Sequence, residues 1–239
     1  MKYMGSKARF AKEILPIILK DRQPEQWYVE PFCGGLGTMQ YVTGKRIAAD
    51  KNKYLIAMWQ GLQKNTPRVH EISKSLYDIA RFEYNRRINN QFTDFEIGWI
   101  GFMASFNGRF YDGGYSGSVG KRNYVREQIN NTENQMVEII NFKDIKFAHS
   151  DYSDLKIPEE SLIYCDIPYI GTKQYSVSSN FDHDKFWNWC RMKKEQGNTI
   201  FVSEYQAPSD FDCVWQKQIT NSMHQKNTKI TTEKLFTLK

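Results

Sequence analysis

The chain has 239 residues, and 33 Lys and Arg against 27 Asp and Glu give it a formal net charge of +6. With 40% hydrophobic and 15% aromatic residues, it can bury a large core, which excludes disorder, collagen-like and coiled-coil architectures as overall descriptions. The basic excess favours a polyanionic partner, although many enzymes without such a partner share it.

Cysteine spacing and hydropathy narrow the possible classes of protein further. Cys33, Cys165, Cys190 and Cys213 show no C-x-x-C pattern, so neither a disulfide framework nor a metal module is predicted. The apolar run 14–19 is too short for a signal peptide, and no stretch reaches the roughly 18 apolar residues of a membrane span. We expect a cytoplasmic protein, monomeric by default, whose partners include neither a membrane nor a metal.

Short apolar runs along the chain predict buried strands. In chain order they are Trp27–Pro31, Arg46–Asp50, Ile145–His149, Ser161–Asp166 and Thr199–Ser203. A segment with helical spacing, Asp182–Glu195, separates the last two, and strands alternating with helices predict a mostly parallel sheet. Cys213–Ile219 and Lys229–Leu238 follow with a polar connection, which predicts an antiparallel terminal hairpin. The predicted fold class is therefore α/β.

A long segment between the second and third strands exceeds an ordinary crossover and predicts an insert. It has helical patterns and one Gly-rich stretch, which is typical of a functional surface loop. We predict a discontinuous core, residues 1–57 and 144–239, and a helical insert, residues 58–143. The predicted helices are Asn52–Leu62, Pro67–Arg87, Asp94–Ala104 and Tyr124–Asn141, and the Gly-rich stretch is Ser105–Tyr124.

A glycine turn follows the first strand, with Gly34, Gly35 and Gly37 in residues 31–37. Such a turn lets the backbone approach a ligand at the carboxyl end of the sheet. The dinucleotide fingerprint would need Gly at position 40, where Gln40 stands, so a nicotinamide cofactor is disfavoured. Asp50 ends the second strand, where a carboxylate can bind the ribose of an adenosine-containing cofactor. The pattern favours a cofactor site over a simple tight turn.

The fourth strand ends in D-I-P-Y, residues Asp166, Ile167, Pro168 and Tyr169. Because Pro168 fixes its own backbone, the turn is stiff. An acid, an exposed main-chain carbonyl and an aromatic ring at a strand end can bind an exocyclic amino group and stack on the ring that carries it. An isolated tetrad of this kind would more often be an ordinary strand-terminal turn.

The motifs occur in an order that resembles the DNA adenine N6-methyltransferase family in which the cofactor motif precedes a D-P-P-Y-type catalytic motif. Ile167 replaces the first Pro of D-P-P-Y, Ser6 replaces a Gly, and a later Gly falls at 37 instead of 36. F-V-S-E-Y resembles a later motif that supports the target pocket. The segments that carry the resemblance are Tyr3–Lys7, Val29–Gly35, Ala48–Ile56, His149–Leu155, Asp166–Tyr169 and Phe201–Tyr205.

The resemblance implies S-adenosyl-L-methionine as cofactor and a role for each matched residue. Asp166 and the Ile167 carbonyl would accept hydrogen bonds from the adenine amine, and Tyr169 would stack on the base. Positioning and electrostatic preorganisation would be the main catalytic terms. The implied cofactor-binding residues are Tyr3, Lys7, Glu30, Pro31, Phe32, Gly34, Gly35, Asp50, Asp151 and Asp166.

Double-stranded DNA is the implied partner, and its adenine must be flipped out to reach such a site. We expect Arg109, Lys121, Arg122 and Arg126 to contact phosphates. Asn107, Arg109 or Tyr111 would reach bases. His183 is expected to be a feature of the fold or the surface.

Two alternatives stay open at this point. One keeps the cofactor but changes the acceptor to RNA or a protein glutamine; glutamine methyltransferases typically show N-P-P-Y, so Asp166 argues for a base. The other is a catalytically degenerate DNA-binding or anti-restriction protein, which the Ile167 and Ser6 departures would allow.

Overall fold

The computed structural model describes residues 1–88, 90–170, 181–221 and 229–239, built around a seven-stranded sheet. The strand order is β5-β2-β1-β6-β7-β9-β8. The strands from β5 to β7 are parallel, and β9 runs antiparallel to both β7 and β8. The predicted α/β class and terminal hairpin are confirmed. The strands are β1 (Tyr28–Glu30), β2 (Arg46–Asp50), β5 (Lys146–His149), β6 (Leu162–Asp166), β7 (Thr199–Glu204), β8 (Phe211–Asn221) and β9 (Lys229–Leu238).

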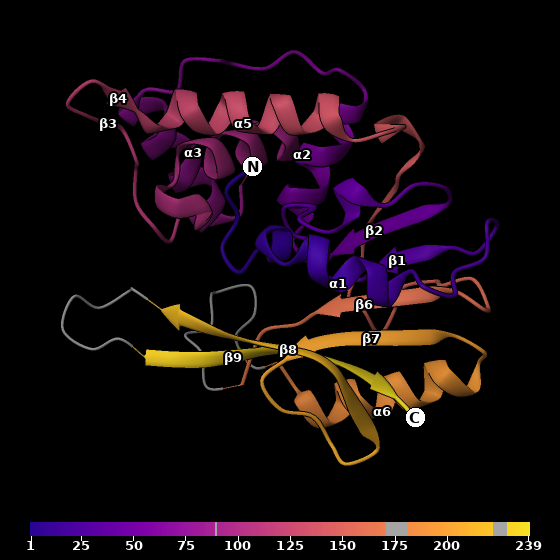
Figure 1. The fold of residues 1–239 in the computed structure, drawn as a ribbon. Helices are drawn as coiled ribbons and strands as arrows, with labels where there is room; N and C mark the ends of the chain where they lie inside the picture. Colours follow the sequence, from indigo (N-terminus) through magenta and orange to yellow (C-terminus); the bar gives the residue numbers. More distant parts are fainter. Residues whose placement is uncertain (89, 171–180, 222–228) are drawn as a thin grey trace.

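Both faces of the sheet are covered, because alternate strand residues point to opposite sides. Tyr28 and Tyr164 belong to the hydrophobic cluster that includes α1 (Ala11–Ile18) and the helices of the insert. Val29 and Ile163 belong to a second cluster formed with α6 (His183–Glu195). Figure 1 shows α6 on the far side of the sheet from α2, α3 and α5.

The segment predicted to be an insert, residues 58–143, is mostly helical. Asn52 caps α2 by accepting from the backbone N–H groups of Tyr54 and Leu55, and Thr93 forms a capping box with Glu96 at the start of α4. Helix α2 continues across residue 57, where the first predicted core segment ends. Helix α4 is buried on nearly all sides. The elements are α2 (Lys53–Gln63), α3 (Lys74–Arg86), α4 (Asp94–Ala104), β3 (Ser118–Val119), β4 (Arg122–Asn123) and α5 (Tyr124–Glu138). Short 3-10 turns span Lys7–Arg9, Met39–Tyr41, Phe106–Gly108 and Phe142–Asp144.

One predicted helix is shorter than expected. The predicted start at Pro67 is wrong, because α3 begins at Lys74 behind the N-cap Ser73. The carbonyl of Val69 accepts from Trp99 Nε1 at 2.7 Å, and the carbonyl of Ile72 accepts from the Tyr115 hydroxyl at 2.7 Å. Side chains distant in sequence therefore donate to carbonyl groups that would accept hydrogen bonds within the helix if α3 began earlier.

Arg46 ties the end of the insert to the sheet. Its guanidinium donates to the carbonyls of Val42, Ile140 and Asn141 at 2.7, 2.8 and 2.9 Å, and its side chain is fully buried on β2. The chain thus returns from α5 to β5 at a fixed place beside β2. Within the described residues, no helix is both long and apolar enough to cross a membrane.

Candidate active site

Four acidic residues lie at the carboxyl ends of adjacent parallel strands. Glu30 ends β1, Asp50 ends β2, Asp166 ends β6 and Glu204 ends β7. The strand order reverses between β1 and β6, and open α/β sheets bind ligands at such a switch point. This edge of the sheet also carries the glycine turn and the D-I-P-Y motif.

The glycine turn is closely packed against the N-terminal segment. A Cβ on Gly34 or Gly35 would come within 2.7 Å or 2.6 Å of the Tyr3 side chain, so neither position has room for one. The Gly34 N–H donates to Asp50 Oδ2 at 3.2 Å, and the Asn52 N–H donates to Oδ1 at 2.9 Å. Burial raises the pKa of Asp50 to about 6, against these two hydrogen bonds. The structure thus brings Tyr3, the turn and Asp50 together.

Asp151 lies beyond β5, on the side of β2. Its carboxylate accepts from the Ser153 N–H and hydroxyl and lies 3.3 Å from Lys51 Nζ. Burial raises the pKa of Asp151, but the Ser153 hydrogen bonds and the Lys51 charge outweigh it and leave the pKa below its ordinary value. Asp151 is therefore an ionised acceptor near the end of β2.

Glu30 lies in the core beneath the glycine turn. Its Oε1 accepts from the Tyr28 hydroxyl at 2.8 Å and from the Thr38 hydroxyl at 2.7 Å. Burial raises the pKa of Glu30 to about 8, against these hydrogen bonds. The side chain therefore has a structural role in the protein as described, and its contact with the cofactor stays a prediction. Pro31 is buried, and the Phe32 ring packs against other aromatic rings.

The predicted catalytic turn, residues Asp166–Tyr169, contacts the Lys7 ammonium at both of its ends. Lys7 Nζ lies 2.9 Å from Asp166 Oδ1 and 4.4 Å from the centre of the Tyr169 ring. Burial raises the pKa of Asp166, and the Lys7 charge opposes that rise. The Tyr169 hydroxyl donates to Glu233 Oε2 at 2.8 Å, and its ring meets that of Tyr205 edge to face. Carboxylate and ring thus converge on one nitrogen donor.

Three residues that hold this turn were not among the predicted site residues. Glu204 Oε2 accepts from the Ile170 N–H at 3.1 Å. His183 Nε2 lies 2.9 Å from the Pro168 carbonyl oxygen, and Glu233 binds Tyr169. The F-V-S-E-Y motif gave a hint of Glu204, whereas His183 and Glu233 come from α6 and β9 and carry no sequence signal that points to the turn.

The predicted DNA-contacting residues occupy different environments. Asn107, Lys121 and Arg126 are exposed, whereas Arg122 is exposed but paired with Glu127 at 2.7 Å. Arg109 is half-buried, and its Nε has no hydrogen-bond partner among the described residues.

Tyr111 requires a correction, because the prediction that it reaches a base does not fit its position. Its side chain is 1% exposed, and its hydroxyl donates to the Ile97 carbonyl at 3.0 Å. Tyr111 and the preceding Phe110 both have a positive φ, which turns their rings into the core of the insert. Tyr111 therefore packs with α4 and is not available to DNA in this conformation.

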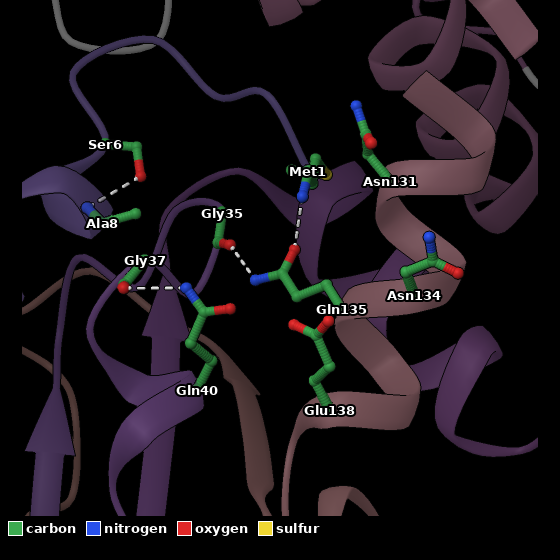
Figure 2. A pocket seen from close by; sticks show the side chains of 10 residues that line it. All are labelled: Met1, Ser6, Ala8, Gly35, Gly37, Gln40, Asn131, Asn134, Gln135 and Glu138. Atoms are coloured by element: carbon green, nitrogen blue, oxygen red, sulfur yellow. Dashed lines mark hydrogen bonds between the residues drawn. The ribbon is translucent and has the colours of Figure 1, made fainter. Parts of the chain in front are cut away.

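A polar cavity of about 270 Å³ adjoins the glycine turn. Figure 2 shows that its lining residues come from the N-terminal segment, the turn and α5. Gln135 on α5 donates from Nε2 to the Gly35 carbonyl at 2.9 Å, and Gln128 exchanges two hydrogen bonds with the backbone of Lys2. Helix α5 of the insert is therefore bonded directly to the segments that surround the site.

The fold and this site define a class of protein: an S-adenosylmethionine-dependent methyltransferase, with a glycine turn after β1, a carboxylate ending β2 and an acid–aromatic turn ending β6. The family model for D12 class N6 adenine-specific DNA methyltransferases matches residues 3–233. The chain belongs to that family. It is an adenine-specific DNA methyltransferase that uses S-adenosyl-L-methionine.

Comparison with other proteins adds distant likenesses. No curated protein matches the chain by sequence. A protein from Thermoplasma acidophilum described as a methyltransferase has a TM-score of 0.38 and 8% identity, covering 92% of this chain and 71% of its own. The tRNA (m1A58) methyltransferase TrmI from Aquifex aeolicus has a TM-score of 0.38 and 9% identity, covering 95% and 68%. SMU.472, solved with S-adenosylhomocysteine, has a TM-score of 0.38 and 12% identity, covering 98% and 52%. These likenesses are too distant to support an argument about the site.

The residues at the switch point fit S-adenosylmethionine. Gly34 and Gly35 leave the turn without side chains, and carboxylate acceptors are offered by Asp50 at the end of β2 and by Asp151 just beyond the neighbouring strand β5. When bound, this cofactor supplies a methyl group already activated on a sulfonium. Among the residues that the structure describes, no group of three or more His, Cys, Asp or Glu could hold a metal ion.

Proposed function

We propose that this enzyme methylates N6 of a specific adenine in double-stranded DNA after the base is flipped into the catalytic turn. In this proposal it acts as a cytoplasmic enzyme. The position of the Lys7 ammonium is the observation that supports it best. A nitrogen donor there bonds to Asp166 and lies over the Tyr169 ring, which is the arrangement that an amino group on a stacked base would need.

The residues of the chain would act on the target amine by orientation. The adenine N6 lone pair is delocalised into the ring, so the amine is a poor nucleophile. Hydrogen bonds from its two N–H groups to Asp166 and to the Ile167 carbonyl would localise that pair and aim it at the methyl group. Ile167 suffices where the family has Pro, because the proposed acceptor is a main-chain atom. Asp166 would also stabilise the positive charge that develops on N6.

Entry of the base requires two local events. Unstacking and unpairing an adenine costs about a few kcal/mol, which stacking on Tyr169 would partly offset. The Lys7 ammonium occupies the place proposed for the target amine, so it has to leave Asp166 when the base arrives. Asp50, Asp151 and the glycine turn would hold the cofactor throughout, since they lie on the β1–β2–β5 side of the switch point.

The exposed cations of the insert are the proposed DNA contacts. Lys121 and Arg122 lie at the β3–β4 hairpin, and Arg126 lies in the first turns of α5. Asn107 is exposed in the turn that follows α4, and the half-buried Arg109 is placed two residues later. We assign phosphate contacts to the hairpin and α5 cations, and base contacts to Asn107 and Arg109.

Transfer of labelled methyl groups tests the proposal. The wild-type enzyme is incubated with labelled S-adenosylmethionine and double-stranded DNA, RNA or a protein mixture, and DNA nucleosides are then analysed. We expect label in N6-methyldeoxyadenosine, and a loss of at least about 100-fold in Asp166→Asn, because the amide cannot accept as the carboxylate does. Label confined to RNA or protein, or an Asp166→Asn enzyme of wild-type rate, would contradict it.

A further inference from the structure

The catalytic turn is held from outside by side chains of two other elements. Glu204, the last residue of β7, accepts from the Ile170 N–H through Oε2 and from the Tyr205 N–H through Oε1, at 3.1 and 2.6 Å. His183, the first residue of α6, places Nε2 at 2.9 Å from the Pro168 carbonyl oxygen. The same His183 nitrogen lies 3.6 Å from Glu204 Oε2. The backbone that follows Asp166 and Ile167 is therefore bound at two successive points.

These contacts favour one protonation state of each side chain, and in Glu204 they oppose burial, which raises its pKa to about 7. A carbonyl oxygen can only accept, so His183 must carry a hydrogen on Nε2 to bind Pro168. The Glu204 side chain is 0% exposed, and a proton on either oxygen would weaken one of its two N–H contacts. The ionised carboxylate is therefore the form that holds the turn, and the His183 N–H next to it is a favourable neighbour.

The orientation of the turn decides how its acceptors meet the target amine. Asp166 and the Ile167 carbonyl must point to one place, and both are set by the backbone that runs on to Pro168 and Ile170. A displacement of about 1 Å at a reacting group can lower a rate by about 100-fold. Contacts that fix Pro168 and Ile170 therefore bear on the reaction through the backbone of the turn.

We infer that Glu204 and His183 are positioning residues for methyl transfer, which together hold the catalytic turn so that Asp166 and the Ile167 carbonyl converge on the adenine amine. This inference rests on the proposed function of the turn. Neither residue contacts Asp50 or the glycine turn in the hydrogen bonds described above, so we expect the pair to act mainly on the chemical step, through the turn that carries Asp166.

Matched variants test the pair. Glu204→Gln keeps the shape of the side chain but replaces one accepting oxygen by an amide NH2 group, which faces a backbone N–H and cannot accept from it. His183→Phe keeps a ring but removes the donor to Pro168, whereas His183→Gln keeps a donor. Glu195→Gln, the same chemical change at the exposed end of α6, is the control. The measurements are single-turnover methylation rate, KM for DNA, Kd for S-adenosylmethionine and Tm.

We expect Glu204→Gln and His183→Phe each to lower the single-turnover rate by about 10- to 100-fold, with Kd for the cofactor within about twofold of wild type. His183→Gln should recover much of the rate. The double variant should lose little more than the worse single one, because both act through one turn. Control Glu195→Gln should match wild type.

Two results would overturn the inference. One is a wild-type rate in either Glu204→Gln or His183→Phe. The other is an equal loss in His183→Phe and His183→Gln that follows a fall in Tm, since this would mark a general packing role. A wild-type enzyme that does not methylate adenine would instead refute the proposed function, so the two failures are distinguishable.

Discussion

Lys7 connects the N-terminal segment to the charge of Asp166. Its ammonium bonds to a carboxylate whose pKa burial raises, and it is the cation nearest to that group in the contacts described. Asp166 must be ionised to accept from the target amine. In the proposed function, Lys7 would therefore keep Asp166 ionised in the free enzyme while it occupies the place proposed for the target amine.

Replacing Lys7 by Met should move the acid limb of the rate profile. Without the cation, the pKa of Asp166 rises further, so the ionised fraction is lost at a higher pH as the pH falls. The measurement is kcat/KM for DNA against pH, which reports the free enzyme in which Lys7 bonds to Asp166, for wild type, Lys7→Met and Lys7→Arg, where Arg keeps the charge. An acid limb at the same pH in wild type and Lys7→Met would count against this role.

Glu30 makes stability depend on pH. Burial holds its pKa at about 8 in the folded protein, whereas the ordinary value is 4.5. Between these values the folded state binds one more proton than the unfolded state, so stability from this group is present at low pH and is lost as the pH rises.

Glu30→Gln should therefore gain stability relative to wild type between about pH 4.5 and 8. The amide keeps an oxygen for Tyr28 and Thr38 and releases no proton. We expect the difference in free energy of unfolding to change by up to about 1.4 kcal/mol per pH unit in favour of the variant. Urea unfolding at several pH values measures it, and a difference that is constant with pH would contradict the assignment.

At the scale of elements, α2 and α4 pack so closely that one glycine is required between them. A Cβ on Gly98 would lie 2.1 Å from the Tyr54 carbonyl oxygen, which is a backbone atom that cannot turn aside. The contact joins α2, the helix that follows β2, to α4 in the core of the insert.

Gly98→Ala should force these two helices apart. We expect a loss of about 1 to 3 kcal/mol in the free energy of unfolding, as for other overpacked cores. Denaturant unfolding of Gly98→Ala beside Asn130→Ala, an exposed position on α5, gives the comparison. Equal midpoints for the two variants would show that the helices adjust without cost.

The central strands β1, β2 and β6 were predicted well because burial on both sides leaves a strong pattern. The expectation of a buried strand at β5 is wrong, because β5 is the edge of the sheet and is exposed or half-buried along its length. The runs ending at Asp50 and Asp166 end there in the structure as well. The start of α3 and the inward rings of Phe110 and Tyr111 could not be read from the sequence, since distant side chains and a positive φ determine them. The role of His183 was not predicted for the same reason: its partner Pro168 lies outside α6, and no sequence spacing relates the two residues.

At the scale of the whole molecule, the net charge of +6 matters less than its placement. Lys121 and Arg126 are exposed on the insert, whereas Lys185 and Lys194 lie on α6, on the opposite face of the sheet. DNA bound against the insert would release counterions from the first pair and not from the second.

Removing Lys121 and Arg126 together should reduce the salt dependence of DNA binding. Each phosphate contact contributes about 0.9 to the slope of log affinity against log salt, so the double Ala variant should lose about 1.8. Lys185→Ala with Lys194→Ala is the control of equal charge. Binding of a short duplex at several salt concentrations gives both slopes, and equal slopes for the two double variants would place DNA elsewhere.

The strand order delays completion of the sheet while the enzyme is being synthesised. β9 follows β8 in the chain but lies between β7 and β8, so β8 cannot join the sheet during synthesis until β9 has emerged from the ribosome. β9 also carries Glu233, which binds the Tyr169 hydroxyl. The insert and the strands on the proposed cofactor side, β1, β2 and β5, can form earlier, because the residues they contact precede β8 in the chain. The nascent chain therefore completes its target pocket after the parts assigned to binding the cofactor and DNA.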